Sequence, residues 1–191
     1  MKLPLDFYTQ EDVVSLARQL LGKVLFTNIE NKITAGIISE TEAYAGITDK
    51  ASHAYGGKRT KRTETMFAEG GISYVYLCYG MYDLFNVVTN KAEIPHAVLV
   101  RSIIPFEGQK TMADRRGVDE ILPKHVNGPG KLTKALAISR ELNGVKLWSN
   151  KIWIEDKNIQ INENEIVTDV RIGIGYAQED ALLPYRFFIK K

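Results

Sequence analysis

Strand-forming segments lie at both ends of this sequence, and helical segments are inserted between them without regular alternation. This order favours an α+β fold around a largely antiparallel sheet over a parallel α/β fold. The predicted strands are residues 23–28, 33–44, 72–78, 84–89, 97–103, 151–155, 170–176 and 185–189. Three helices are predicted. The first begins at a capping box at 9–12 and ends at Gly22, and the other two cover 107–116 and 131–141.

The length and composition are sufficient for one domain with its own core. The chain has 191 residues, of which 45% are hydrophobic, so one hydrophobic core can form. The single cysteine, Cys78, excludes an internal disulfide framework and gives no reason to expect structural zinc. We find neither a secretory signal nor an apolar stretch long enough to span a membrane, so we expect a cytoplasmic protein.

The distribution of charge says more than the total, which is only +2. One dense basic cluster stands out, Lys58, Arg59, Lys61 and Arg62, directly after two glycines. Such a loop can contact nucleic-acid phosphates. It can equally be an ordinary solvated loop, and the cluster alone does not decide between the two.

Two acidic side chains and a tyrosine share one face of the predicted strand 33–44. Strand alternation places Glu40, Glu42 and Tyr44 together. Two neighbouring carboxylates repel, so one of them is expected to have a raised pKa unless the other is paired. A raised pKa suits a general base. The alternative is an acidic strand end that faces solvent.

A second segment, residues 72–86, is unusually rich in tyrosine. Alternation places Tyr74 and Tyr76 on one face of the first strand of a hairpin, and its tip carries Tyr79, Met81 and Tyr82. Aromatic faces can stack on a nucleobase, and an apolar tip can fill the gap left by a base that leaves the duplex. Half-buried sheet tyrosines are the alternative interpretation.

Several other chemistries lack their residues. The sequence contains neither a Walker A loop nor a Gly-x-Ser-x-Gly elbow, and residues 173–175 carry only part of a dinucleotide-binding pattern. The three histidines, His53, His96 and His125, stand singly, and the zinc deaminase motif is absent.

Seven short sequence motifs, taken together, resemble the alkyladenine (3-methyladenine) DNA glycosylase family, and the resemblance runs from about residue 6 to the end of the sequence. Their order along the chain also follows that family. They are residues 40–44, His53, residues 66–67, residues 74–82, residues 98–101, residues 128–132 and residues 171–175. The resemblance implies a compact bacterial-type member, with residues 1–191 as a single glycosylase domain. It also implies a curved, open roll or barrel-like sheet with a protruding hairpin and peripheral helices.

The resemblance assigns roles to residues of the pocket. It implies that Glu42 activates the water that attacks C1′ of the sugar, and that Tyr44 and Tyr76 sandwich the flipped base. His53 would form a hydrogen bond at the pocket wall near the sugar or phosphate. Asn86 would lie at the pocket floor, where its amide crowds the exocyclic amine of normal guanine.

Other residues are expected to contact the DNA. The resemblance implies that Tyr79 is the wedge in the vacated stack and that Arg101 helps to hold the flipped nucleotide and its phosphates. The basic loop and a helix start after Gly130 are further candidates for phosphate contacts. The expected DNA-binding set is Tyr79, Met81, Tyr82, Arg101, Lys58, Arg59 and Lys131.

The predicted function is therefore a monofunctional DNA glycosylase of base excision repair. It would remove damaged purines of the 3-methyladenine type from double-stranded DNA, as a monomer, without a metal or organic cofactor, in the nucleoid of a bacterial cytoplasm. A helix-hairpin-helix glycosylase is one alternative, but residues 142–146 lack its second glycine. A non-catalytic module that binds lesions or RNA is another, although it would not need Glu42.

Overall fold

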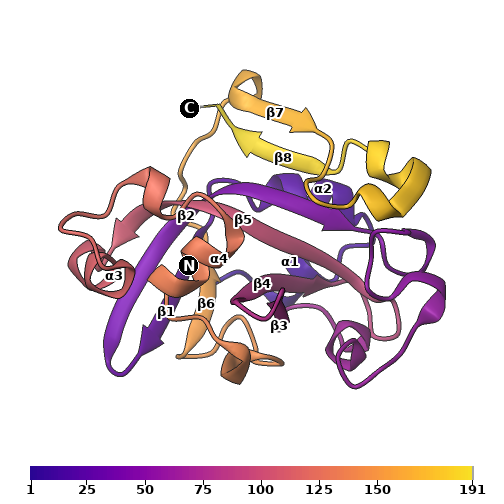
Figure 1. Cartoon of the computed structure of the whole chain (residues 1–191), viewed down its shortest axis with the longest axis horizontal. Coiled ribbons are helices and arrows are strands. Elements are labelled where there is room, and N and C mark those ends of the chain that lie inside the picture. Colours follow the sequence, from indigo (N-terminus) through magenta and orange to yellow (C-terminus); the bar gives the residue numbers. More distant parts are fainter. Residues whose placement is uncertain (191) are drawn as a thin grey trace.

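A curved antiparallel sheet forms the centre of the molecule, in a computed structural model that describes residues 1–190. Its order is β3-β4-β5-β2-β1-β6, and a hairpin of β7 and β8 joins it through a β8–β2 pairing (Figure 1). The strands are β1 (Val24–Ile29), β2 (Lys32–Tyr44), β3 (Ser73–Cys78), β4 (Tyr82–Thr89), β5 (His96–Glu107), β6 (Ile152–Glu155), β7 (Ile166–Asp169) and β8 (Arg186–Ile189).

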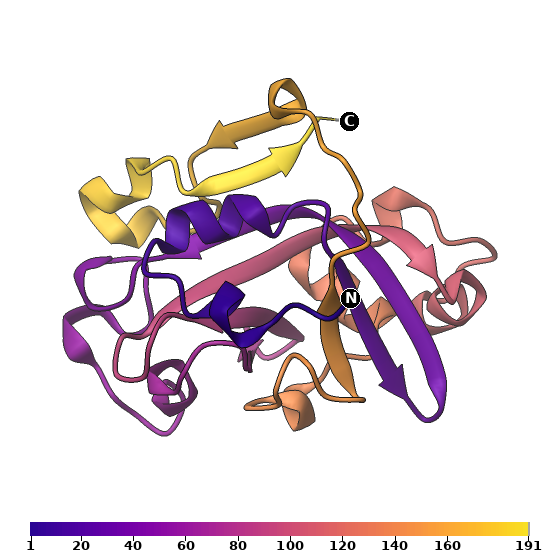
Figure 2. The ribbon, with the colours of Figure 1, turned by 180° about the vertical axis from the view of Figure 1, so that it is seen from behind.

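Helices lie on both sides of this sheet. Helix α2 (Val13–Gln19) packs on β2 and β5 and is in front in Figure 2, with the short α1 (Leu5–Tyr8) beside it. Helix α4 (Pro129–Ala135) packs on β4, β5 and α3 (Gln109–Arg116). Short 3₁₀ segments cover Gly46–Thr48, Tyr55–Gly57, Glu64–Phe67, Pro123–His125, Arg140–Leu142, Glu163–Glu165 and Gly175–Leu182. The α+β class and the antiparallel sheet are confirmed.

Two tight hairpins define the register of the sheet. Glu30 and Asn31 connect β1 to β2 and both have positive φ, at 55° and 59°, as a two-residue hairpin that follows the sheet twist requires. The hairpin of β3 and β4 turns at Tyr79 and Gly80, with φ of 49° and 70°. Its predicted tip is confirmed, except that Tyr82 already pairs with Cys78 as the first residue of β4.

The helix boundaries differ from those predicted. The predicted capping box at 9–12 is wrong, since Asp12 is the N-cap of α2 and its carboxylate accepts hydrogen bonds from the backbone of Val14 and Ser15. Helix α4 begins at Pro129 and ends at Ala135, earlier than residue 141. Within the described part of the chain, every helix is too short or too polar to cross a membrane.

The predicted strand 170–176 is also wrong. The short strand β7 lies just before it, and the chain then forms a loop in which Gly173 has a φ of 76°. Alternating Ile and Gly residues imitate a strand pattern, but a positive φ at Gly173 turns the chain away from the sheet. This loop runs beside β2, and its backbone contributes to the site described below.

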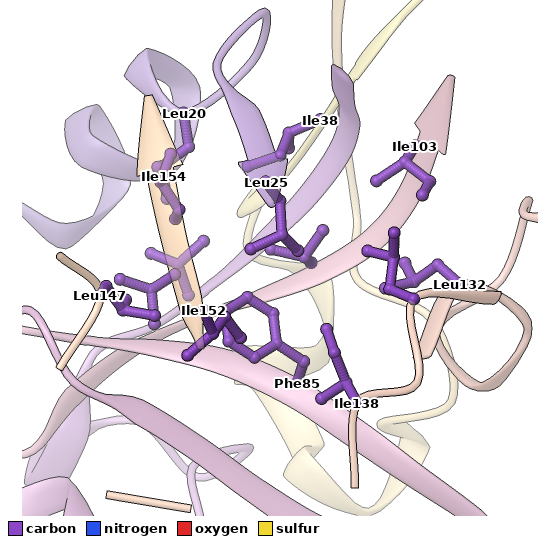
Figure 3. Close-up of a cluster of buried hydrophobic side chains, with 14 of the residues drawn as sticks. Leu20, Leu25, Ile38, Phe85, Ile103, Leu132, Ile138, Leu147, Ile152 and Ile154 are labelled. Carbon is purple, nitrogen blue, oxygen red and sulfur yellow. The ribbon is translucent and has the colours of Figure 1, made fainter. Parts of the chain in front are cut away.

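One large hydrophobic cluster forms the main core of the molecule. Strands β1, β2, β4, β5 and β6 contribute to it together with helices α2 and α4 (Figure 3). The labelled members include Leu20, Leu25, Ile38, Phe85, Ile103, Leu132, Ile138, Leu147, Ile152 and Ile154. A smaller cluster with Met66, Phe67 and Tyr74 lies under the loop after β2. The two clusters therefore occupy opposite sides of β3 and β4.

Truncation of Leu25 should test the core. Leu25 is 0% exposed, whereas Leu182 is 76% exposed. Leu25→Ala should lower the free energy of unfolding by about 2–5 kcal/mol, because it leaves a cavity in a close-packed interior. The matched control Leu182→Ala should change it by less than about 0.5 kcal/mol. Urea denaturation measures both, and similar losses would contradict this description of the core.

Candidate active site

The site lies on the face of the sheet opposite the main core, and strand alternation determines which residues face it. On β2, Ala43 packs into the main cluster while Glu42 and Tyr44 point the other way. On β5, Val98 and Val100 enter the same cluster. The period of two residues thus divides each strand between core and site.

Cross-strand pairing aligns the site residues in one row. Tyr74 of β3 is opposite Asn86 of β4, Asn86 is opposite Leu99 of β5, and Leu99 is opposite Glu42 of β2. Residues that are opposite each other in antiparallel strands carry their side chains on the same face. The sheet therefore brings residues from four strands into a single row, with Glu42 at one end.

Glu42 is a fully buried acid whose oxygens are both bound. Oε1 accepts a hydrogen bond from the backbone N–H of Ile172 at 2.8 Å, and Oε2 accepts one from the Tyr44 hydroxyl at 2.8 Å. Its exposed fraction is 0%. Burial raises the pKa of the Glu42 carboxyl above its ordinary value, and the charge of Arg101 and both hydrogen bonds reduce that rise.

Arg101 lies between the two carboxylates predicted to share a face. Its Nε is 3.3 Å from Oε1 of Glu40, and its Nη1 is 3.4 Å from Oε2 of Glu42. The β5 register slips at this point, since Ser102 pairs with Glu40 and Val100 with Thr41. Such a bulge re-aims a side chain. Arg101 thereby contacts both acids, and the predicted shared face is confirmed.

Glu40 has a second cationic partner, which separates its environment from that of Glu42. Arg186 of β8 reaches Oε1 of Glu40 at 3.1 Å and also pairs with Asp169 of β7. Glu40 therefore has two arginine partners, whereas Glu42 has only the longer contact with Arg101. Of the two, only Glu42 combines full burial with a position beside the tyrosines.

Aromatic rings line the wall beyond Glu42. His53 Nδ1 and the Tyr74 hydroxyl are 3.0 Å apart, and the His53 ring meets the Tyr76 ring edge-on at 4.6 Å. Burial and the neighbouring Glu42 raise the pKa of Tyr44, which keeps its hydroxyl a hydrogen-bond donor at neutral pH. Burial, Arg62 and Lys58 lower the pKa of His53 to about 4, so its ring is neutral.

A groove of about 680 Å³ runs along this wall. It is lined by Tyr44, Tyr76, Arg101 and Ile172, among others, and a small inner cavity of about 40 Å³ continues to Asn86. The Asn86 amide donates to the backbone oxygen of Tyr74 at 3.1 Å. Asn86 thus lines the small cavity but not the groove, whereas Tyr44 and Tyr76 border both spaces.

The hairpin tip stands at the edge of the groove. Tyr79 is 86% exposed, Met81 69% and Tyr82 49%. Tyr79 and Tyr82 line the groove. A group of exposed large apolar side chains is unusual on a protein surface and typically marks an interaction site. Gly130 of α4 is tightly apposed to the ring of Tyr82, where an added Cβ would come within 2.6 Å. A glycine is therefore needed beneath the hairpin.

The predicted basic residues have different surroundings. Lys131 lines the groove, and Arg101 also lines it from β5. Lys58 lies in an exposed loop. Arg59 in that loop pairs with Glu64 and Glu93, at 2.7 and 2.6 Å.

Several residues that border the groove were not assigned to the site from the sequence, although one of them, Arg62, belongs to the basic cluster noted there. The Arg62 guanidinium lies 4.8 Å from the centre of the Tyr76 ring, and Tyr176 and Ile172 line the groove from the loop after β7. Residues 171–175 belong to the segments that resemble the family, so the sequence did indicate that this region is functional. Predicting a strand over 170–176 concealed the loop that carries Ile172 and Tyr176. Among residues 1–190, His, Cys, Asp and Glu side chains form no group of three that could hold a metal ion.

The arrangement is a buried carboxylate bonded to residues of a tyrosine-lined groove that also carries basic side chains. Comparison with known proteins shows which class of enzyme has it. The sequence model of the family described as Methylpurine-DNA glycosylase (MPG) matches residues 6–191. A Chlamydia abortus protein named "Putative 3-methyladenine DNA glycosylase" is 48% identical over 189 residues, covering 98% of this chain and 97% of the relative. Identically named proteins of Clostridium perfringens and Bdellovibrio bacteriovorus are 43% and 40% identical, each covering 100% of this chain and 96% of the relative.

The chain therefore belongs to the methylpurine-DNA glycosylase family, and the predicted resemblance is confirmed. It is a hydrolase of DNA repair that acts on N-glycosyl bonds. The two alternatives, a helix-hairpin-helix glycosylase and a non-catalytic binding module, are not supported, because the family is one of enzymes and the fold is built on a large sheet.

The protonation of His53 can be measured directly. A histidine NMR titration should give His53 a midpoint near 4, not its ordinary 6.5. Because the pKa of His53 is lower in the folded protein than its ordinary 6.5, the unfolded chain binds the proton more readily. The folded state therefore has its full stability above pH 6.5 and loses this contribution as the pH falls through 4. Arg62→Gln should move the midpoint upward by removing a nearby positive charge. A midpoint of 6.5 in the unaltered protein would contradict this description.

Proposed function

We propose that the enzyme flips an alkylated purine of the 3-methyladenine type out of double-stranded DNA and hydrolyses its glycosidic bond. The observation that carries this proposal is the Glu42 carboxylate, fully buried and bonded to groove residues at the end of the row. A buried acid with a raised pKa is suited to accept a proton near neutral pH. In this proposal residues 1–191 act as a single glycosylase domain.

The flipped base would lie between Tyr44 and Tyr76. Both rings border the groove and the inner cavity, and base–aromatic stacking contributes about 1–3 kcal/mol per base. His53 is expected to present a neutral ring to the sugar or phosphate side. Asn86, which lines the small cavity, would oppose the exocyclic amine of normal guanine.

Hydrolysis then requires one water molecule and no cofactor. The bond between the purine nitrogen and C1′ breaks, and the base leaves with its bonding electrons. The oxygen of the water bonds to C1′, and Glu42 accepts a proton from the water. A cationic alkylated base leaves as a neutral molecule, so departure needs little assistance. The carboxylate also stabilises the positive charge that develops on the sugar.

Entry of the water requires a small rearrangement around Glu42. In the free protein Tyr44, Arg101 and Ile172 enclose the carboxylate. The Arg101 contact is the longest of the three, at 3.4 Å. We expect Arg101 to move toward a phosphate of the flipped nucleotide and so to expose Oε2 of Glu42 to the attacking water.

The hairpin tip and the basic residues would hold the duplex. Tyr79 would fill the vacated stack, with Met81 and Tyr82 against the neighbouring bases, because an exposed apolar tip can enter an opened minor groove. Lys131, Lys58 and Arg59 would contact phosphates. The Arg59 ion pairs are exposed and contribute little to stability, so a phosphate can replace them. We expect the enzyme to act as a monomer on the nucleoid in a bacterial cytoplasm.

Replacing the acid tests the chemical step. Glu42→Gln should lower the single-turnover rate of base release from methylated DNA by about 10²–10⁴-fold, while binding to lesion-containing duplex persists. Glu163→Gln, an exposed change paired with Arg18, should leave the rate unaltered. Normal release by the Glu42 variant would remove this residue from its proposed role.

The rate should also depend on pH in a defined direction. Since water activation needs the ionised carboxylate, the rate should rise with pH through a midpoint above the ordinary 4.5 of a glutamate. A pH series of single-turnover base release measures this midpoint. A rate that is constant from pH 4 to 8 would contradict general-base catalysis by Glu42.

The wedge can be tested by comparing two substrates. Tyr79→Ser should weaken binding to a lesion in duplex DNA by about 5- to 150-fold, since stacking of about 1–3 kcal/mol is lost. Binding to the same lesion in single-stranded DNA should change much less, because no vacated stack needs filling. Equal losses in the two titrations would exclude the wedge.

A further inference from the structure

A second buried charge pair lies beside the residues that bond to the proposed catalytic carboxylate. The Arg171 guanidinium meets the Asp49 carboxylate through two hydrogen bonds, at 2.5 and 2.9 Å, and both side chains are essentially unexposed. The same carboxylate accepts the backbone N–H groups of Ala45 at 2.9 Å and Ala51 at 3.0 Å. Asp49 thereby fixes the chain directly after β2.

Arg171 connects this segment to a distant part of the chain. It donates to the backbone oxygen of Ala43 at 2.8 Å and to that of Asp180 at 3.1 Å. The Asp180 side chain in turn accepts the backbone N–H of Lys50 at 2.8 Å. Residues 43–51 and 171–180 are thus held together through a single guanidinium.

Both direct neighbours of Glu42 depend on this connection. Ile172, next to Arg171 in the chain, donates its backbone N–H to Oε1 of Glu42. The Arg171 guanidinium also lies 4.9 Å from the centre of the Tyr44 ring, whose hydroxyl donates to Oε2. One buried arginine therefore holds the donors to both oxygens of the carboxylate.

Stability alone does not account for such a pair. Burying two charges carries a desolvation cost that their attraction often fails to exceed, and apolar residues of similar volume would serve equally well. In addition, the Nε of Arg171 is buried without a hydrogen-bond partner, which is a further cost. What the pair does supply is fixed geometry, because a bidentate contact has one preferred arrangement.

We infer that Asp49 and Arg171 are positioning residues for Glu42: together they hold the Ile172 amide and the Tyr44 hydroxyl against its carboxylate. This inference rests on the proposed role of Glu42. The pair touches neither the groove floor nor the expected position of the water, so it acts through its neighbours. Loss of the pair should release the 171–180 loop from β2 and leave Oε1 of Glu42 without its amide donor.

The loss has a predictable sign. The hydrogen bond from Ile172 favours the ionised carboxylate and lowers its pKa. Without that hydrogen bond the carboxylate should be protonated to a higher pH, so a smaller fraction of the enzyme is active under acidic conditions. A displaced Tyr44 should also lower the rate at its plateau.

Single-turnover base release as a function of pH tests the inference, with lesion binding and thermal unfolding measured on the same samples. The variants are Arg171→Gln, which removes the charge, and the milder Arg171→Lys and Asp49→Asn. Asp156→Asn is the control, since it breaks an ion pair of 2.6 Å with Lys23 that lies outside the site.

We expect the acidic limb of the profile to move to higher pH in all three site variants, and the plateau of Arg171→Gln to fall by about 10²-fold, the scale of a misplaced catalytic group. Asp156→Asn should lower only the unfolding temperature. If Arg171→Gln does not fold, the limb of Arg171→Lys decides. Site variants that are less stable but keep the unaltered profile would overturn the inference. Wild-type protein that releases no base would instead overturn the proposed function itself.

Discussion

The pairing of β2 with β5 is the constraint on which the rest of the structure depends. These two long strands run through the middle of the sheet, and their alternation sends Ala43, Val98 and Val100 into the core while Glu42 points the other way and bonds to Tyr44, which lines the groove. A shift of one residue would exchange the two sets. Folding of the core and assembly of the site are therefore one event, because the same strands specify both.

Burial of Glu42 connects stability with chemistry. Removing a carboxylate from water is costly unless donors compensate. Here Tyr44, Arg101 and the amide of Ile172 provide that compensation. The compensation is incomplete, since the pKa remains raised. An acid that is held in place but incompletely stabilised in its charged form is what proton transfer from water requires. The second carboxylate on the same face, Glu40, differs from Glu42 because it pairs with two arginines, Arg101 and Arg186.

Local patterns in the sequence predicted much of this arrangement, and non-local contacts account for what they missed. Alternation placed Glu42 with Tyr44, and the turn residues predicted both hairpins. The end of α4 was not predicted because the left-handed position that follows the helix is taken by Ala137, with a φ of 52°. A glycine usually occupies this position, and a glycine would have indicated the end of the helix. Residues 170–176 look like a strand, yet the Ile172 amide bonds to a side chain of β2. The partners of Arg59 come from residues 64 and 93, which no local pattern connects.

The protonation of Glu42 in the free protein is the most direct test of this account. A ¹³C NMR titration of its side-chain carboxyl, assigned by comparison with a variant lacking that carboxyl, gives the midpoint without any substrate. The account predicts a midpoint above the ordinary 4.5, because burial outweighs the three donors. A midpoint at or below 4.5 would contradict it, since the carboxylate would then be stabilised in its charged form and poorly suited to accept a proton.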